Sequence, residues 1–222
     1  MYYVIGDVHG QYELLMDLES QLPPDANLIF VGDLIDRGPD SKEIIRFVRE
    51  NGCQCVRGNH EEYMINQGQT NNVPWCENIY FYEWLENGGM MTLFSYGIIG
   101  EYEKFFNNPD NENHIFFDDT KWLSTLPYYI ELDSPKVNGR NVVISHSSIG
   151  NMWYNRHGSE FKKHVIFNRN IPTDTKNIFN IFGHTVTKEI VVNDFSASID
   201  TGAFSRKKLS ALQIPDLKIF ST

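Results

Sequence analysis

The stretch that decides the fold is Gly32-Asp33-Leu34-Ile35-Asp36-Arg37-Gly38, which directly follows the apolar run Leu28-Ile29-Phe30-Val31. The apolar run predicts a short buried strand, and the two glycines allow a sharp turn just past its end. Two carboxylates and one guanidinium lie between these glycines. A carboxylate can bind a metal ion or orient another side chain, and a guanidinium can hold a phosphate group as a planar fork. Taken alone, the stretch is equally compatible with a surface turn, because glycine and aspartate are common turn residues.

Two similar turns flank this stretch along the chain. Residues 2–5 predict a strand that ends in Gly6-Asp7-Val8-His9-Gly10, and residues 53–56 predict one that ends in Arg57-Gly58-Asn59-His60-Glu61. A helix is expected in each interval, so the order is β-α-β-α-β. In open α/β sheets, ligands bind beyond the carboxyl ends of the strands. Three successive polar turns at such ends therefore indicate a binding site.

The rest of the chain predicts a helical region followed by a return to strands. Residues 62–135 are rich in asparagine and aromatic residues and are interpreted as a helical insertion within a single domain, 1–222. A helix at 78–87 should end at Gly88-Gly89, and another should start at Asp118-Asp119-Thr120. Residues 151–170 are expected to be loop or helix. The predicted later strands are 128–132, 142–144, 177–182, 196–199, 209–214 and 217–220, the last two forming a hairpin.

The aromatic residues of the insertion are expected to form its core, and only secondarily a substrate surface. They are Trp75, Tyr80, Phe81, Tyr82, Trp84, Phe94, Tyr96, Phe105, Phe106 and Trp122.

Composition excludes several classes of function. The 222 residues are 41% hydrophobic, enough for a sizeable core, and carry a net charge of −10 from 29 acidic and 19 basic residues. Because phosphate contacts need Lys and Arg, nucleic acid is not an expected partner. No apolar run is long enough to cross a membrane, so membrane association is not expected either. With no signal peptide in the sequence, a cytoplasmic location is predicted.

The cysteines, Cys53, Cys55 and Cys76, do not predict a disulfide framework or a zinc site. Their number is odd, and Cys53 and Cys55 alternate as residues of a strand do rather than forming Cys-x-x-Cys. Both side chains are expected to point to one face of the sheet as small hydrophobes.

Six polar residues in the turns suit a site for two metal ions. They are Asp7, His9, Asp33, Asn59, His146 and His184. Carboxylate oxygen and neutral imidazole suit Mn, Fe or Zn, and a carboxylate can bridge two ions. Such a site can clamp a phosphate and produce hydroxide at neutral pH. Each residue alone has an ordinary explanation: the histidines could be satisfied structural residues, and Asn59 could cap a helix that starts near residue 60.

The three motifs, in this order and spacing, resemble the signature motifs of the PPP-type metallophosphatases, a branch of the calcineurin-like phosphoesterase superfamily. The resemblance is dense over residues 2–62 and resumes at His146, at Gly183-His184 and at Asp200-Thr201-Gly202-Ala203. The chain is close in size to the compact phage and bacterial serine/threonine protein phosphatases. The fold implied is α/β (α+β), a central β-sandwich flanked by helices with the site at one edge.

The resemblance also implies a role for each motif residue. Asp7, His9 and the bridging Asp33 would hold one metal ion, and Asp33, Asn59, His146 and His184 the other. Two divalent ions are implied, Mn²⁺ first, with Fe or Zn as alternatives. His60 resembles the general acid of the family, and Asp36 its carboxylate partner. Arg37 and Arg57 resemble the phosphate-binding arginines, and Arg169 in Asn168-Arg169 is a further candidate.

The implied reaction is hydrolysis of phosphate monoesters without a covalent phosphoenzyme. A hydroxide that bridges the metals would attack phosphorus in line, and His60 would give a proton to the leaving oxygen. A cysteine-phosphatase loop is absent, because Glu61 rather than an arginine follows Cys55 by six residues.

Three functions remain open from the sequence. The first is a serine/threonine protein phosphatase, whose substrate would be a phosphoprotein or a small phosphoester. The second is a bis(5'-nucleosyl)-tetraphosphatase, a diadenosine tetraphosphate hydrolase, since those bacterial enzymes share the three motifs and the aromatic insertion could stack a base. The third is a non-catalytic binding module, which the complete set of motif residues disfavours. Ser147-Ser148 after His146 departs from many relatives, which have a small residue and Gly there, and leaves the choice of substrate open.

Overall fold

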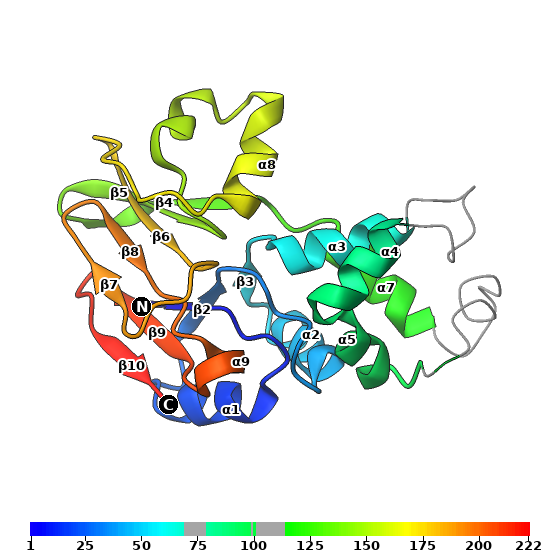
Figure 1. Cartoon of the computed structure of the whole chain (residues 1–222). Helices are drawn as coiled ribbons and strands as arrows, with labels where there is room; N and C mark the ends of the chain where they lie inside the picture. Colours follow the sequence, from blue (N-terminus) through cyan, green and yellow to red (C-terminus); the bar gives the residue numbers. More distant parts are fainter. Residues whose placement is uncertain (69–78, 99, 101–113) are drawn as a thin grey trace.

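The computed structural model describes residues 1–68, 79–98, 100 and 114–222. It contains two five-stranded mixed sheets that pack face to face, with helices outside them (Figure 1). This confirms the predicted β-sandwich flanked by helices.

The first sheet carries the three motif turns. Its order is β10-β9-β1-β2-β3. The strands β1, β2 and β3 are parallel, and β9 runs antiparallel to β1. Their bounds are β1 Tyr2–Ile5, β2 Asn27–Phe30, β3 Gln54–Cys55, β9 Ser210–Ile214 and β10 Ile219–Ser221. Because β1, β2 and β3 are parallel and adjacent, the turns that follow them lie at the same edge of the sheet.

The second sheet has the order β4-β5-β6-β8-β7. Its strands are β4 Tyr129–Val137, β5 Arg140–Ser145, β6 Ile178–Phe182, β7 Val191–Val192 and β8 Ser196–Ser198. The predicted strand 128–132 thus extends further, with an irregularity between Leu132 and Val137, into a hairpin with β5. The short strand β7 was not predicted, because two exposed valines give no periodic signal.

The core follows from the alternation of side chains along the strands. Val4 of β1 and Ile29 of β2 point into the interior between the sheets, where they meet Ile144 and Ile181 of the second sheet. Their neighbours in sequence point to the opposite face, which packs on α1 Tyr12–Ser20 and α2 Ser41–Glu50. Cys53 and Cys55 belong to this same face, as predicted.

Helices also cover the second sheet, and they form most of the described part of the insertion. The helix α8 Ser159–Phe167 and the 3-10 segment Gly150–Asn155 pack on Val143 and Ile178. The described part of residues 62–135 is mainly helical and lies beside β3 (Figure 1). Its elements are α3 Asn59–Gly68, α4 Ile79–Trp84, the π-helical segment Leu85–Gly89, α5 Met90–Ser95 and α7 His114–Leu123.

Of the two helix boundaries predicted in the insertion, one is confirmed and one is wrong. The helix predicted to end at Gly88-Gly89 breaks there, because Gly88 has non-helical backbone angles within the π-helical segment, and α5 begins at Met90. Gly88 adopts φ 109°, and a Cβ there would lie 2.9 Å from the backbone nitrogen of Arg37. That nitrogen donates to the Gly88 carbonyl oxygen at 3.2 Å. Glycine is therefore needed both for the helix break and for the close approach to the motif turn.

The helix start predicted at Asp118-Asp119-Thr120 is wrong, because these residues lie within α7 rather than at its start. Asp119 is buried there and accepts hydrogen bonds from Arg49 and from the Tyr96 hydroxyl, so it links helices instead of capping one. Phe81, Trp84 and Tyr96 are buried, in agreement with an aromatic core, but the prediction is wrong for Tyr82 and Phe94, whose side chains are exposed. Trp75, Cys76, Phe105, Phe106 and the side chain of Tyr80 lie outside the described residues.

Among the described helices, none combines the length and the apolar character that a membrane span requires. The cytoplasmic location stays a prediction.

Candidate active site

The motif turns are joined to one another by backbone hydrogen bonds. The backbone N–H groups of Val8 and His9 donate to the carbonyl oxygen of Asp33 at 3.1 and 2.9 Å. Asp33 and His9 both have positive φ, 49° and 47°. Non-glycine residues in this region are strained by about 1 kcal/mol or more and concentrate at functional sites. The strained backbone brings side chains from separate strands to one place.

Two histidines are oriented by backbone carbonyl groups. The Nδ1 of His9 lies 2.9 Å from the carbonyl oxygen of Ile35, and the Nδ1 of His146 lies 2.8 Å from that of Val31. A carbonyl can only accept, so each Nδ1 carries the proton. Burial lowers the pKa of His9 to about 3 and also lowers the pKa of His146. Both rings are therefore neutral, with a lone pair on Nε2, which is the form that binds metal.

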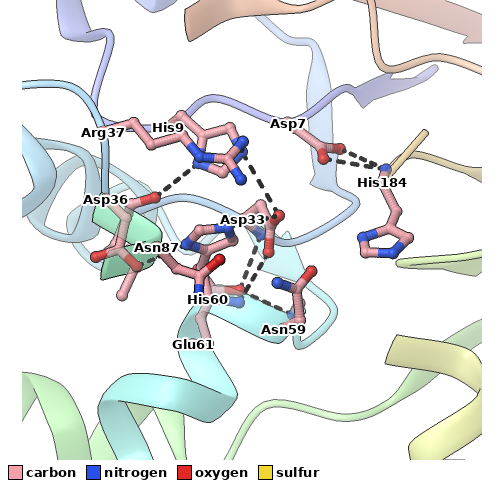
Figure 2. A network of polar contacts seen from close by, with 12 residues as sticks. Asp7, His9, Asp33, Asp36, Arg37, Asn59, His60, Glu61, Asn87 and His184 are labelled. Carbon is pink, nitrogen blue, oxygen red and sulfur yellow. Dashed lines mark hydrogen bonds and ion pairs between the residues drawn. The ribbon is translucent and has the colours of Figure 1, made fainter. Parts of the chain in front are cut away.

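Asp33 lies between the two histidines and is shared by two potential metal-binding groups. Its Oδ2 is 3.6 Å from His9 Nε2, and its Oδ1 is 3.4 Å from His146 Nε2. One group comprises His9, Asp33 and His60, and the other Asp33, His146 and His184. Figure 2 shows Asp33 near the centre of the network, between His9, His60 and Asn59. This is the geometry expected of a bridging carboxylate.

The potential metal-ligand atoms around His146 suit a bound cation. Its Nε2 lies 3.0 Å from Asn59 Oδ1 and 3.1 Å from His184 Nδ1. Neutral His146 cannot donate from Nε2, so its lone pair faces the Asn59 and Asp33 oxygen atoms, which also only accept. A positive ion between these atoms removes that repulsion. His184 adds a buried Nε2 without a hydrogen-bond partner in the described part of the chain. The oxygen and imidazole donors suit a divalent transition metal.

Asp7 lies beside these groups but in neither of them. Its carboxylate accepts the backbone N–H of His184 at 3.0 and 3.3 Å, as Figure 2 shows. Burial, followed by the negative charges of Asp200 and Asp33, raises the pKa of Asp7 well above its usual range. A Cβ at Gly183 would lie only 1.9 Å from Asp7 Oδ1, so glycine is required there. A nearby cation would stabilise the ionised carboxylate.

His60 and Asp36 form a buried pair. The His60 Nδ1 lies 2.6 Å from Asp36 Oδ2, and its Nε2 is 3.9 Å from Asp33 Oδ2. Burial alone would lower the pKa of His60, but the charge of Asp33 and the hydrogen bond that His60 Nδ1 donates to Asp36 together raise it. The Nε2 has no hydrogen-bond partner among the described residues. The His60 Nε2 therefore lies at the metal-binding groups, while Nδ1 is hydrogen-bonded to Asp36.

The structure separates the three arginines predicted to bind phosphate. The Arg37 guanidinium donates to His9 Nε2 at 2.9 Å, and that of Arg169 donates to the His184 carbonyl oxygen at 3.2 Å. Both therefore lie beside the metal-binding groups. The Arg57 guanidinium makes its hydrogen bonds outside the metal-binding groups. It donates to Glu62, to the Tyr128 hydroxyl and to the carbonyl oxygens of Ser124 and Leu126.

Two features of the site were not predicted. Glu61 is fully buried, and its carboxylate accepts the backbone N–H groups of Asp33, Leu34 and Gly58, each at 2.8 Å. Asp200 is also buried, which raises its pKa to about 6, and it accepts the backbone N–H of Gly202 at 2.9 Å. Glu61 is the last residue of the third motif turn, and Asp200 is the first residue of Asp200-Thr201-Gly202-Ala203. The only sequence pattern that marks these two acids is their position near a glycine turn, and acidic residues in exposed turns have the same pattern.

The unusual Ser147-Ser148 pair now has a structural explanation. Asn168 donates from Nδ2 to the carbonyl oxygen of Ser148 at 2.7 Å and to its Oγ at 2.8 Å. The backbone N–H of Asn168 donates to Ser147 Oγ at 3.2 Å. Arg169 is the next residue, so the serines fix the loop that carries this arginine.

A comparison with known families agrees with this geometry. The family model for Calcineurin-like phosphoesterase matches residues 2–188, which include all the predicted metal ligands. The chain belongs to this family. As a calcineurin-like phosphoesterase it is a metallophosphoesterase, a hydrolase, which confirms the class of enzyme predicted from the motifs.

Similar proteins of this family carry two different activities in their names. The chain is 27% identical to serine/threonine-protein phosphatase 2 of Escherichia coli (strain K12) over 225 residues, covering 96% of this chain and 92% of the relative. It is 25% identical to the asymmetrical bis(5'-nucleosyl)-tetraphosphatase PrpE of Anoxybacillus flavithermus (strain DSM 21510 / WK1) over 251 residues, covering 100% and 93%. The crystal structure of a putative diadenosine tetraphosphatase shares the fold, with a TM-score of 0.66 at 19% identity over 100% of this chain and 92% of that one.

Proposed function

We propose that this calcineurin-like phosphoesterase hydrolyses phosphate monoesters, with phosphoserine and phosphothreonine of proteins as its first substrate class. The observation that carries the proposal is the position of Asp33, which is shared by two groups of buried metal ligands. Two adjacent cations joined by one carboxylate are the arrangement that in-line displacement at phosphorus uses.

Six residues would hold the cations. Asp7, His9 and Asp33 would bind one, and Asp33, Asn59, His146 and His184 the other, with Mn²⁺ as the first choice and Fe or Zn as alternatives. The chemistry that such ions supply when bound is activation of water and neutralisation of phosphate charge. The neutral state of His9 and His146 and the lone pairs that face one another around His146 support this assignment.

The chain's own groups would bind phosphate and move the proton. Arg37 and Arg169 lie beside the ligand groups and would hold the phosphate oxygens through charge-assisted hydrogen bonds. His60 would donate from Nε2 to the leaving oxygen, while its Nδ1 stays bonded to Asp36. The contacts of Arg57 favour a structural role, so binding of phosphate by Arg57 stays a prediction from the resemblance.

Dinucleoside tetraphosphate is the alternative substrate. It is supported by the tetraphosphatase PrpE and by the structural similarity to the putative diadenosine tetraphosphatase. A kinetic comparison of kcat/KM for a phosphoserine peptide and for diadenosine tetraphosphate, with Mn²⁺ added to metal-free protein, tests the choice. Faster hydrolysis of the dinucleotide would overturn the first substrate class while leaving the metal site in place.

Catalysis itself is tested with p-nitrophenyl phosphate. Metal-free protein should become active when Mn²⁺ is added, and Asp33→Asn should remove that response. A protein that binds two Mn²⁺ ions but hydrolyses none of the three substrates would revive the non-catalytic binding module.

A further inference from the structure

The carboxylate of Asp36 is surrounded by hydrogen-bond donors from three different elements. His60 Nδ1 lies 2.6 Å from Oδ2, and Trp84 Nε1 lies 3.0 and 3.1 Å from the two oxygens. The Thr92 hydroxyl donates to Oδ1 at 2.6 Å. Asp36, Trp84 and Thr92 are all completely buried. In such a site, three donors on one carboxylate fix the plane and rotation of the group.

The hydroxyl of Thr92 also contacts the backbone of Asp36. The Asp36 N–H donates to Thr92 Oγ1 at 3.0 Å and to Ser41 Oγ at 3.1 Å. Because the Thr92 proton is used on the carboxylate, the Ser41 hydroxyl must donate to Thr92 in their 2.9 Å contact. Thr92 therefore bonds to both the main chain and the side chain of Asp36.

Trp84 and Thr92 belong to the helical insertion, in α4 and α5, whereas Asp36 and His60 belong to the motif turns. The Gly88 carbonyl oxygen, between α4 and α5, accepts the N–H of Arg37. The insertion thus reaches two adjacent residues of the motif. An insertion that only packed against the motif turn would bury apolar side chains at this contact. Instead it supplies two polar donors directed at one carboxylate.

We propose that Trp84 and Thr92 are positioning residues for proton donation, acting through Asp36 on the ring of His60. The proposal rests on the proposed function, in which His60 protonates the leaving oxygen. Without these two donors, Asp36 would rotate and the His60 ring would lose its fixed orientation. The insertion would then contribute to catalysis as well as to the core.

Leaving-group dependence tests the proposal. A general acid is needed most when the leaving group is basic, so phenyl phosphate should depend on it more than p-nitrophenyl phosphate. Thr92→Val, which keeps the shape but removes the hydroxyl, should lower kcat for phenyl phosphate about tenfold, a fraction of the 10²–10⁴-fold typical of general acids. The loss for p-nitrophenyl phosphate should be clearly smaller, with KM and bound metal unchanged. Trp84→Phe should act in the same direction, and Thr92→Ser should restore activity.

Matched controls lie in the same insertion. Thr120 donates to the carbonyl oxygen of Phe116 at 2.8 Å, away from Asp36, and Trp122 packs at the edge of the core. Thr120→Val and Trp122→Phe should leave the ratio of the two rates unchanged. Equal losses on both substrates in Thr92→Val, or the same change of ratio in the controls, would overturn the inference.

His60→Asn in the same assay separates this inference from the proposed function. If His60→Asn shows no leaving-group selectivity, the general acid itself is misassigned. If His60→Asn shows the selectivity and folded Thr92→Val does not, only the inference fails. Proton NMR of the metal-free protein gives an independent measurement. The Nδ1 proton of His60 should resonate far downfield in the wild type and should move upfield in Thr92→Val. An unchanged resonance would count against positioning by Thr92.

Discussion

Glu61 Oε2 accepts the backbone N–H of Asp33 at 2.8 Å, and this bond joins the third motif turn to the second. The same oxygen accepts the N–H of Gly58 at 2.8 Å, and Oε1 accepts that of Leu34. A buried carboxylate thus satisfies the donors of a strained turn that β-sheet pairing cannot reach. The position of the proposed bridging ligand depends on an acid that would not itself contact a metal ion.

Glu61→Gln should destabilise this turn. One side-chain oxygen becomes an NH₂ group that faces backbone N–H donors, so at least one donor loses its partner. We expect the free energy of unfolding of the metal-free protein to fall by about 2–3 kcal/mol, measured by urea denaturation. Glu86→Gln, an exposed change in the insertion, is the control. Equal free energies of unfolding for the two variants would show that the Glu61 hydrogen bonds make no net contribution to stability.

His60→Asn should lower turnover while leaving metal binding intact. It removes the proposed proton donor but none of the six proposed ligands. We expect kcat to fall by about 10²–10⁴-fold, the range for general acid catalysis. Metal content, measured by elemental analysis after gel filtration, should equal that of the wild type. A parallel loss of metal and activity would mean that His60 is a ligand, as its place in one of the geometric groups would allow.

Asp33→Asn should weaken both metal sites at once. A neutral amide is a poor bridge, and both ligand groups contain Asp33. Calorimetric titration with Mn²⁺ should show lower affinity at both sites, and added Mn²⁺ should raise the melting temperature less than in the wild type. Asp174→Asn, at an exposed surface pair with Arg140, is the control. Retention of two tight sites by Asp33→Asn is the outcome that contradicts bridging.

The arginines Arg37 and Arg57 should respond differently to substitution by lysine. Arg37 borders the ligand groups, so Arg37→Lys should raise the inhibition constant for inorganic phosphate about tenfold or more through loss of a planar fork. Arg57 is bound to four other groups of the protein. Arg57→Lys should therefore cost about 2 kcal/mol of stability and change phosphate inhibition little. The reverse pattern would restore Arg57 as the phosphate-binding residue implied by the resemblance.

Ser148→Ala should affect substrate binding through Arg169. The change removes one of the two oxygens that hold the Asn168 amide. One neutral hydrogen bond contributes about 0.5–1.5 kcal/mol, so KM should rise roughly two- to tenfold with a smaller change in kcat. Ser20→Ala, on the far helix α1, provides the comparison. An unchanged KM would mean that the Asn168 loop holds its position without the hydroxyl.

The elements that could be predicted were those with local signals. Apolar runs bounded by glycine gave the strands β1 and β2 within a residue, and the parallel order of β1, β2 and β3 placed His9, Asp33 and Asn59 at one edge. Errors occurred where a residue serves a distant partner. Asp119 looks like a helix start, but it lies within α7 and binds Tyr96.

By itself, the sequence determined which residue types gather at the strand ends, because this depends on short-range patterns of apolar residues, glycine and carboxylate. The family and the sandwich fold were implied by the resemblance of the three motifs to those of PPP-type metallophosphatases. Only the tertiary structure decided which atoms face one another. It turned Arg57 away from the ligand groups, fixed the protons of His9 and His146 on Nδ1, and directed Trp84 and Thr92 of the insertion at Asp36. These relationships join residues far apart in the chain, and only packing specifies the distances between such residues.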